Sequence, residues 1–245
     1  QAAHRVKTTP NTLYILWSGA NDAAQAYQKN GFKKGLFTAL ETTLPDEQIT
    51  NIKKLVNDGA KNIVIFNQFN LVYTPEFIEK LGLDKLSPEL RYIASSLANF
   101  LPQIYNNALK KKLVAYQVAH TNVNLYLYDV NKVIQNAASE NKNFQDTIGE
   151  RCEDSSSVYQ SAFFQASYKN CAGYLFWNNA HPATPMQQLI AYNLMHNQNT
   201  VKPVSELSLS TTKTPILSEG DLEFLKNKAP KAYQLFQAIM ELTHP

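Results

Sequence analysis

The stretch Leu13–Asp22, Leu-Tyr-Ile-Leu-Trp-Ser-Gly-Ala-Asn-Asp, is an apolar run that ends in a turn-forming Gly-Ala-Asn-Asp sequence. Consecutive large apolar residues are typical of a strand covered on both faces, because a half-exposed strand alternates apolar and polar residues. Gly19 permits a turn that a β-carbon would obstruct. The stretch therefore predicts a buried strand whose carboxyl end, where open α/β sheets bind their ligands, carries Asn21. A neutral amide at that place can donate a hydrogen bond to a developing oxyanion.

The next hundred residues repeat the alternation of strand and helix. Residues 23–35 are polar and contain two glycines, which predicts a loop or frayed helix at the mouth of the site. Apolar residues between positions 36 and 56 recur at helical spacing, with Pro45 as a break or a new start. Residues 63–66, Ile-Val-Ile-Phe, predict a second buried strand. Strand, helix and strand with short connections indicate a parallel sheet.

A long helix and a third strand follow. Ser87-Pro88-Glu89 is a helix start with an N-cap, an N1 proline and a first-turn acid, and the helix is expected to reach about Lys112. We give Asn106 on this helix a structural role. Residues 123–130 predict the third strand. Asp129 at its end is interpreted as a cap for the following helix in preference to a free acid.

A second motif lies late in the chain, where residues 174–184 read Tyr-Leu-Phe-Trp-Asn-Asn-Ala-His-Pro-Ala-Thr. Another apolar run ends here in a His-Pro pair, and a helix is expected to follow. Taken with Gly19-Ala20-Asn21-Asp22, this motif resembles the fifth and third sequence blocks of the SGNH, or GDSL, family of serine ester hydrolases. The nearest likeness is to the lecithinase and thermolabile-haemolysin branch, which contains bacterial phospholipases and cholesterol acyltransferases.

The resemblance implies roles for four residues. His181 matches the general base, and Asn21 and Gly19 match the oxyanion and turn positions. Asn178 stands three residues before the histidine, where the family has an acid; its amide can hold the ring but cannot stabilise the imidazolium. No residue matches the nucleophile, because the sequence contains no Gly-Asp-Ser. The family mechanism requires neither a cofactor nor a metal.

The resemblance also implies the fold, a three-layer α/β/α sandwich of the SGNH hydrolase type, flavodoxin-like, with a mainly parallel sheet and its N-terminal elements missing. Residues 1–197 are expected to form the hydrolase-like domain. Residues 198–245 are expected to form a linker and a C-terminal helical extension. Docking of that extension on the core is its expected arrangement, with binding to a partner and contact with lipid as the alternatives.

Cys152 and Cys171 are the two cysteines of the chain. They flank one loop without a His/Cys cluster, which favours a disulfide over a metal site, with two buried free thiols as the alternative. Closing such a loop stabilises a fold by about 3 kcal/mol in the chain-entropy model, and implies an oxidising compartment and export. Phe163-Phe164 between them is interpreted as packing, with membrane or substrate contact as the alternative.

The composition limits the class of protein. With 245 residues, of which 44% are hydrophobic and 18% charged, the chain can form one globular domain with a substantial core. A formal net charge of +3 is too small and scattered to indicate a nucleic-acid partner. No apolar run approaches the ~18 residues of a membrane span. Because Gln1 is not an initiator methionine, we expect an N-terminal segment to have been removed or left out.

Two hypotheses of different classes remain open. The first is a secreted lipolytic acyl-ester hydrolase or acyltransferase of bacterial origin, of phospholipase A or lysophospholipase type, whose serine lies on a missing N-terminal segment or a partner chain. Its expected partners are a phospholipid or other acyl-ester substrate and a peripheral membrane surface. The second is a degenerate SGNH domain that binds a lipid, a glycan or a protein. An enzyme acting on carbohydrate esters is a weaker third hypothesis.

Overall fold

The computed structural model describes residues 8–70, 73–82, 88–140, 151–152, 171, 173–209 and 217–243, with the side chains of residues 88–98, 139–140 and 243 outside this description. The described chain divides into two compact units. The first contains residues 8–68, 103–129 and 198–209, and the second contains the other described residues.

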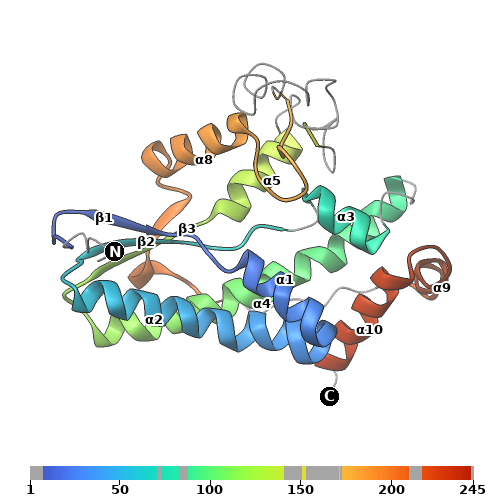
Figure 1. The fold of residues 1–245 in the computed structure, drawn as a ribbon, viewed down its shortest axis with the longest axis horizontal. Helices are drawn as coiled ribbons and strands as arrows, with labels where there is room; N and C mark the ends of the chain where they lie inside the picture. Colours follow the sequence, from blue (N-terminus) through green and yellow to red (C-terminus); the bar gives the residue numbers. More distant parts are fainter. Residues whose placement is uncertain are drawn as a thin grey trace, which may run out of the picture. The chain divides into compact units, whose positions relative to one another are not determined.

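A four-stranded sheet forms the centre of the first unit (Figure 1). Strands β1 (Leu13–Leu16), β2 (Asn62–Phe66) and β3 (Asn124–Tyr128) are parallel and neighbours in that order. Strand β4 (Val201–Pro203) pairs antiparallel with β3, with Leu127 opposite Lys202. The predicted α/β class with a mainly parallel sheet is confirmed, and β4 arises within a segment expected to be a linker.

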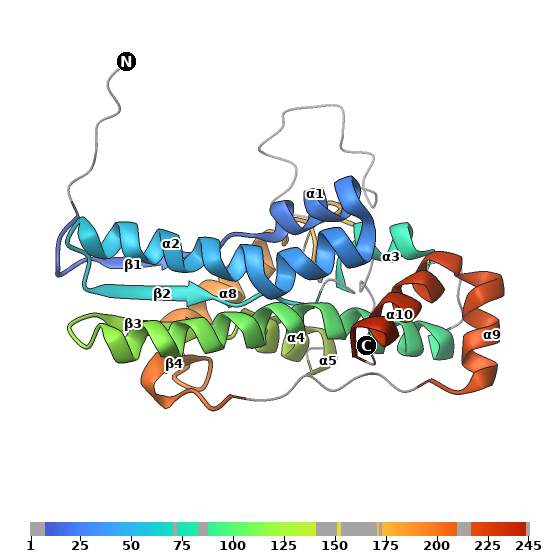
Figure 2. The ribbon, with the colours of Figure 1, turned by 90° about the horizontal axis from the view of Figure 1, so that it is seen from below.

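Helices cover one face of this sheet. Helix α2 (Leu44–Asn57) and the later part of α4 (Pro88–Ala119) run along it in both views (Figures 1 and 2). Pro45 lies at the start of α2, and Asp46 and Glu47 in its first turn complement the helix dipole. The interior between these elements is apolar; Ile52, Ile63, Ile65, Leu109, Leu113 and Leu125 are buried.

Residues 23–35, predicted as a loop or frayed helix, are helical. Helix α1 (Ala20–Gly31) is followed by two π-helical segments, η1 (Phe32–Phe37) and η2 (Ala39–Thr43), which lead into α2. Of the two alternatives the helix is confirmed, and the loop is wrong because the polar residues that suggested it lie on the exposed side of α1, where a helix needs no apolar residues.

The prediction that β1 is covered on both faces is also wrong. Leu13, Ile15 and Trp17 alternate along one face and are 49%, 50% and 42% exposed. β1 is the edge strand of the sheet in the described part of the chain, whereas β2 lies between two strands and is buried over residues 63–66. The run of apolar residues therefore identified the strand, but it did not specify whether other elements cover both faces of that strand.

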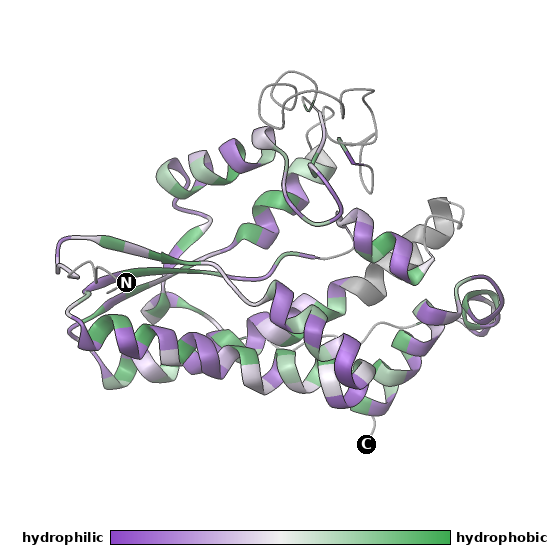
Figure 3. Cartoon of the chain, viewed as in Figure 1, coloured by the Kyte–Doolittle hydropathy of each residue, from purple (hydrophilic) through white to green (hydrophobic). Residues whose placement is uncertain are grey.

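The second unit combines helices with the non-helical residues 173–183. It contains α3 (Pro75–Leu81), α5 (Val130–Glu140), α8 (Thr184–His196), α9 (Glu219–Lys228) and α10 (Pro230–Thr243). Helix α10 packs against α3, and α5 against α8. The buried apolar residues of α10 include Leu235 and Ile239, and hydrophobic and hydrophilic segments alternate along this helix in Figure 3. The C-terminal helices are thus docked, as the sequence predicts.

Candidate active site

The turn after β1 presents Asn21. Gly19 has φ 112° and stands at the N-cap of α1, so a left-handed residue ends the strand and starts the helix. Asn21 lies in the first turn of α1 and is exposed. In the part of the chain that the structure describes, its side-chain amide has no hydrogen-bond partner. The amide is therefore available to a ligand oxygen at the carboxyl edge of the sheet.

Two buried glutamines form hydrogen bonds to Ser18 at the start of this turn. Gln68 Nε2 donates to the carbonyl oxygen of Ser18 at 2.9 Å, and Gln48 Nε2 donates to Ser18 Oγ at 2.6 Å. A β-carbon on Gly19 would lie 3.4 Å from Gln68 Nε2, so the turn and the amide are in close contact. These bonds fix the residue that directly precedes the Gly-Ala-Asn-Asp sequence.

Asn106 in turn holds Gln68. Its Oδ1 accepts from the backbone N–H of Gln68 and its Nδ2 donates to the Gln68 carbonyl, both at 2.8 Å. The structural role given to Asn106 from the sequence agrees with this arrangement. The roles of Gln48 and Gln68 were not predicted from the sequence. The polar pair Asn67-Gln68 directly after a buried strand was the signal that could have found Gln68.

Asp129 forms hydrogen bonds that link separate parts of the first unit. Its Oδ1 accepts a hydrogen bond from Asn67 Nδ2 at 2.7 Å, and its backbone N–H donates to the Thr200 carbonyl. It joins the ends of β2 and β3 and directly precedes α5, so it is not a free acid. Capping of α5 by the Asp129 side chain, the role expected from the sequence, stays a prediction.

The late motif forms a tight loop in the second unit. The backbone N–H of Trp177 donates to the His181 carbonyl at 2.7 Å, and that of Ala183 donates to the Leu175 carbonyl at 2.9 Å. An antiparallel bridge between Phe176 and Pro182 closes the same loop. His181 is exposed near its tip and Asn178 is half-buried.

Asn178 binds the ring of His181. Its Oδ1 lies 2.9 Å from Nδ1 of His181, and the same oxygen accepts the backbone N–H groups of Ala180 at 3.1 Å and His181 at 3.0 Å. Two N–H donors cannot face an NH₂ group, so the amide oxygen must be the atom turned towards the ring. Nδ1 of the neutral imidazole must then carry the proton, which leaves Nε2 as a lone-pair acceptor.

A disulfide supports this loop. Cys152 and Cys171 are bonded, with their Cα atoms 5.4 Å apart, as predicted; the alternative of two free thiols is excluded. The two cysteines form a buried cluster with Ala183, against which Trp177 packs. The backbone N–H of Cys152 also donates to the Phe176 carbonyl at 3.1 Å. The disulfide therefore anchors the base of the histidine loop.

Helix α3 supports the loop from another direction. The N–H of Glu76 in its first turn donates to the Asn179 carbonyl at 3.0 Å. Glu79 on the same helix pairs with Arg151, which stands beside Cys152. The loop that carries Asn178 and His181 is thus held by backbone bonds, a disulfide and a helix.

The structure brings the predicted residues together in two pairs. Gly19 and Asn21 form one turn in the first unit, and Asn178 and His181 form one loop in the second. The Phe163-Phe164 pair lies outside the described residues.

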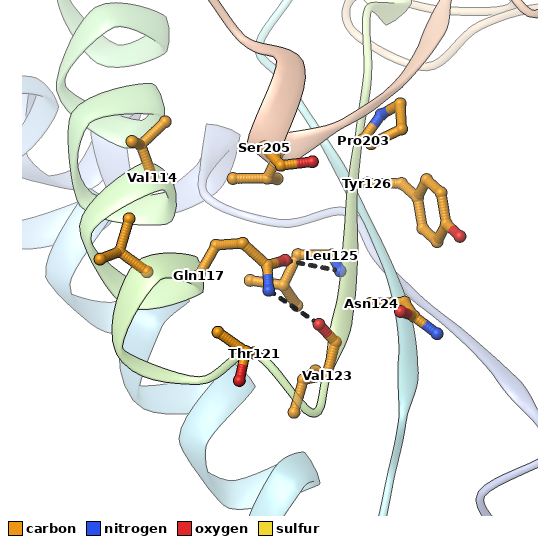
Figure 4. Close-up of a pocket in the computed structure, with 11 residues that line it drawn as sticks. Val114, Gln117, Thr121, Val123, Asn124, Leu125, Tyr126, Pro203 and Ser205 are labelled. Atoms are coloured by element: carbon orange, nitrogen blue, oxygen red, sulfur yellow. Dashed lines mark hydrogen bonds between the residues drawn. The ribbon is translucent and has the colours of Figure 1, made fainter.

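A cavity of about 450 Å³ lies elsewhere in the first unit (Figure 4). Its walls include Val114, Val118, Leu125 and Val204, at the amino end of β3. Gln117 on its wall is fully engaged with the chain, donating to the Val123 carbonyl and accepting from Leu125 N–H. The cavity is at the opposite end of the strands from Asn21, so a ligand bound in it would not contact that residue.

The described ranges contain no group of three His, Cys, Asp or Glu side chains that could hold a metal ion. Among the helices in those ranges, none has the length and apolar character needed to cross a membrane.

Comparison with known proteins agrees with these two motifs. The family model described as GDSL-like Lipase/Acylhydrolase matches residues 1–194, which is most of the chain and includes both the Asn21 turn and the His181 loop. No curated protein matches the sequence. The chain belongs to the GDSL-like lipase/acylhydrolase family.

Proposed function

We propose that this chain is the histidine- and oxyanion-bearing part of a lipolytic acyl-ester hydrolase or acyltransferase of phospholipase A or lysophospholipase type. Family membership supports acyl-ester hydrolysis in general. The finer substrate class rests on the likeness of the two motifs to the lecithinase and thermolabile-haemolysin branch. The disulfide supports export, because such bonds persist in oxidising compartments.

One observation carries the proposal: Asn178 Oδ1 lies 2.9 Å from His181 Nδ1 while accepting two backbone N–H groups. This geometry leaves Nε2 of His181 able to take a proton. A residue that orients an imidazole in this way is the supporting member of a nucleophile–base–orienter triad.

Each residue has a proposed part in the reaction. His181 Nε2 removes the serine hydroxyl proton as the oxygen attacks the ester carbonyl, and later returns that proton to the leaving alcohol. The Asn21 amide and the Gly19 N–H donate to the carbonyl oxygen as it becomes an oxyanion. Water then attacks the acyl-enzyme ester through the same proton transfers, which releases the acid and restores the serine hydroxyl. In acyl transfer another alcohol takes the place of water. Asn178 acts on His181 as a positioning residue.

The serine belongs to a segment outside these 245 residues in this proposal, because they contain no Gly-Asp-Ser. β1 offers a place for it: the strand has an open edge in the described sheet, and Leu13 and Ile15 are half exposed. A parallel strand added there would pair with the edge and cover apolar surface.

A second candidate is a binding module for a lipid, a glycan or a protein, built on the same fold. The specific observation in its favour is an amide at position 178, which gives no charge stabilisation to an imidazolium. Under this hypothesis the histidine loop is a structural remnant.

The test is intact-mass analysis and N-terminal sequencing of the native protein, followed by assays on p-nitrophenyl acyl esters and lysophosphatidylcholine. We expect the native form to carry a Gly-Asp-Ser segment and to turn over. The His181→Ala variant should be inactive, and Asn21→Ala should lose about 10²–10³ in turnover. Residues 1–245 alone should be inert.

Two results would overturn the hydrolase proposal. One is a native chain that begins at Gln1 and hydrolyses neither substrate, which favours the binding module. The other is hydrolysis that survives in His181→Ala, which assigns the chemistry to other residues.

A further inference from the structure

The cavity beside β3 results from the short length of β4. Strand β4 pairs with β3 at Tyr126 to Tyr128, opposite Pro203 to Val201. Proline has no N–H to donate to a further pair, and the chain turns after Pro203 into the short 3₁₀ helix η6 (Val204–Glu206). The first residues of β3 therefore have no strand beside them on this side in the described sheet. The cavity of about 450 Å³ lies between these residues, α4 and η6 (Figure 4).

Gln117 on α4 takes the place of a strand at this edge. Its Nε2 donates to the Val123 carbonyl at 2.8 Å, and its Oε1 accepts from the Leu125 N–H at 3.1 Å. These are two groups that a neighbouring strand would otherwise pair. Nε2 also donates to the His120 carbonyl at 3.1 Å. Because these polar groups are already paired, a water molecule inside the cavity finds few hydrogen-bond partners among them.

The rest of the wall is aliphatic and uncharged. Val114 and Val118 on α4 line the cavity together with Leu125 on β3 and Val204 on η6, and the last two are buried. None of the described residues that line it is Asp, Glu, Lys, Arg or His. A charged ligand would lose hydration there without meeting an opposite charge. An aliphatic chain would instead remove apolar surface from water.

Exposed residues with hydroxyl groups mark the opening of the cavity. Val118 is 75% exposed, and Thr121 and Ser205, which also line the cavity, are exposed. Neither hydroxyl has a hydrogen-bond partner in the described part of the chain. Both are therefore available to an oxygen atom at the outer end of a ligand. At roughly 30 Å³ per non-hydrogen atom, the share of one water molecule in the liquid, about fifteen such atoms fill the cavity.

We propose that this cavity is a binding site for a neutral aliphatic molecule with one terminal oxygen, such as a medium-chain alcohol. Its volume lies in the usual range for small-molecule sites. The chain lies between α4 and β3 against Val114 and Leu125, and the terminal oxygen lies at the opening beside Thr121 and Ser205. The site is separate from the Asn21 turn and goes beyond the proposed function, because binding there requires no serine.

The test is an NMR titration of the 245-residue chain, labelled with ¹³C at its valine and leucine methyl groups, with 1-butanol, 1-hexanol and 1-octanol. We expect saturable shifts at Val114, Leu125 and Val204, and none at Val56 on α2, which does not line the cavity. The dissociation constant should fall about fourfold for each added methylene, from the usual free energy of burying one. Hexanoate and hexylammonium, which carry a charge in place of the hydroxyl of 1-hexanol, should bind at least about tenfold more weakly than 1-hexanol.

The variant Val114→Phe places a larger side chain in the cavity and should remove the saturable shifts at Leu125 and Val204. Its matched control is Val56→Phe, the same change at another half-buried valine, which should bind 1-hexanol as wild type does. Circular dichroism shows whether both variants are folded.

Three results would overturn the inference: shifts in wild type that grow linearly without saturation, equal affinity for 1-hexanol and hexanoate, or undiminished binding by a folded Val114→Phe. The wild-type titration with the charged molecules decides the question even where Val114→Phe does not fold.

Discussion

The amide oxygen of Asn178 accepts three hydrogen bonds, one from the ring of His181 and two from the backbone of the same loop. An amide in place of a carboxylate usually risks the wrong imidazole tautomer, because its NH₂ group can turn to the ring; in a serine protease such a change costs about 10⁴ in turnover. Here the two backbone donors oppose that rotation. The loop thus keeps the proton of the neutral His181 ring on Nδ1, although Asn178 lacks the negative charge of a carboxylate.

The first prediction concerns this tautomer. At a pH where the ring is neutral, the ¹⁵N chemical shifts of His181 should show a protonated Nδ1 and an unprotonated Nε2 in wild type. Asn178→Ala removes the acceptor, so the ring should become a mixture of tautomers. Asn178→Asp should keep protonated Nδ1 and, in the native form that turns over, raise turnover, because a carboxylate stabilises the imidazolium.

His196 provides the internal control for this measurement, because its Nδ1 contacts the Tyr192 carbonyl on α8 and should not respond to changes at position 178. A wild-type spectrum with the proton on Nε2 would show that the amide is turned the other way. In that case Asn178 would not prepare His181 as a base.

The second prediction concerns the support of the Asn21 turn. Asn106→Ala leaves the backbone N–H and carbonyl of Gln68 without their partners in a buried place. Each unpaired buried group costs about 1–3 kcal/mol, so the variant should lose roughly 3 kcal/mol of unfolding free energy. Urea denaturation measures this loss. The control Asn30→Ala, an exposed change on α1, should change the unfolding free energy by no more than about 0.5 kcal/mol. A similarly small loss in Asn106→Ala would show that the two bonds between Asn106 and the Gln68 backbone do not stabilise the fold.

The third prediction concerns the disulfide beneath the histidine loop. Reduction, or the variant Cys152→Ala/Cys171→Ala, should lower stability by about 2–4 kcal/mol. Because the disulfide cluster includes Ala183 and contacts Trp177, the loop should loosen as well. Thermal unfolding with and without a thiol reductant gives the first quantity, and amide exchange at Trp177 and Ala183 gives the second. Unchanged exchange at both amides would mean that the loop stands without its disulfide.

The parallel sheet and its order of elements followed from the sequence because β2 and β3 carry local patterns of apolar residues bounded by turns. The disulfide was favoured from the sequence because the two cysteines flank one loop without a His/Cys cluster, and the structure decides between it and two free thiols. β4 was missed because three residues at a sheet edge have no periodicity to detect. The exposure of β1 was missed because burial depends on neighbours that a single stretch of sequence does not specify.

The candidate site was predictable to the level of motifs. Asn21 and His181 stood out because each follows an apolar run and a turn. The oxygen of Asn178, by contrast, is fixed by two backbone N–H groups, and no side-chain pattern reports where backbone donors converge. Gln48 and Gln68 act through hydrogen bonds to Ser18 across 30 and 50 residues of sequence, a relationship that local patterns do not contain.

The fourth prediction concerns Tyr105, which is fully buried in the first unit and whose hydroxyl has no hydrogen-bond partner in the described structure. Burial raises the pKa of this phenol well above its ordinary value of about 10, and the negative charge of Glu47 raises it further. The folded chain therefore keeps this proton at a pH where the unfolded chain releases it. The contribution of this phenol to the free energy of unfolding is fully present below about pH 10 and is lost as the pH rises beyond that value.

Tyr105→Phe removes both the unpaired hydroxyl and the titration. At about pH 8 the variant should be as stable as wild type or more stable by up to about 1 kcal/mol, because no hydrogen bond is lost and a buried polar group is gone. Between about pH 10 and pH 11 wild type should lose about 1 kcal/mol more than the variant, because the unfolded phenol is already half ionised at pH 10. Urea titrations at pH 10 and pH 11 measure this difference in unfolding free energy. The control is Tyr192→Phe, a change at an exposed tyrosine. A variant that is less stable than wild type at pH 8 would show that the hydroxyl has a partner, and equal alkaline losses would show that Tyr105 is not the titrating group.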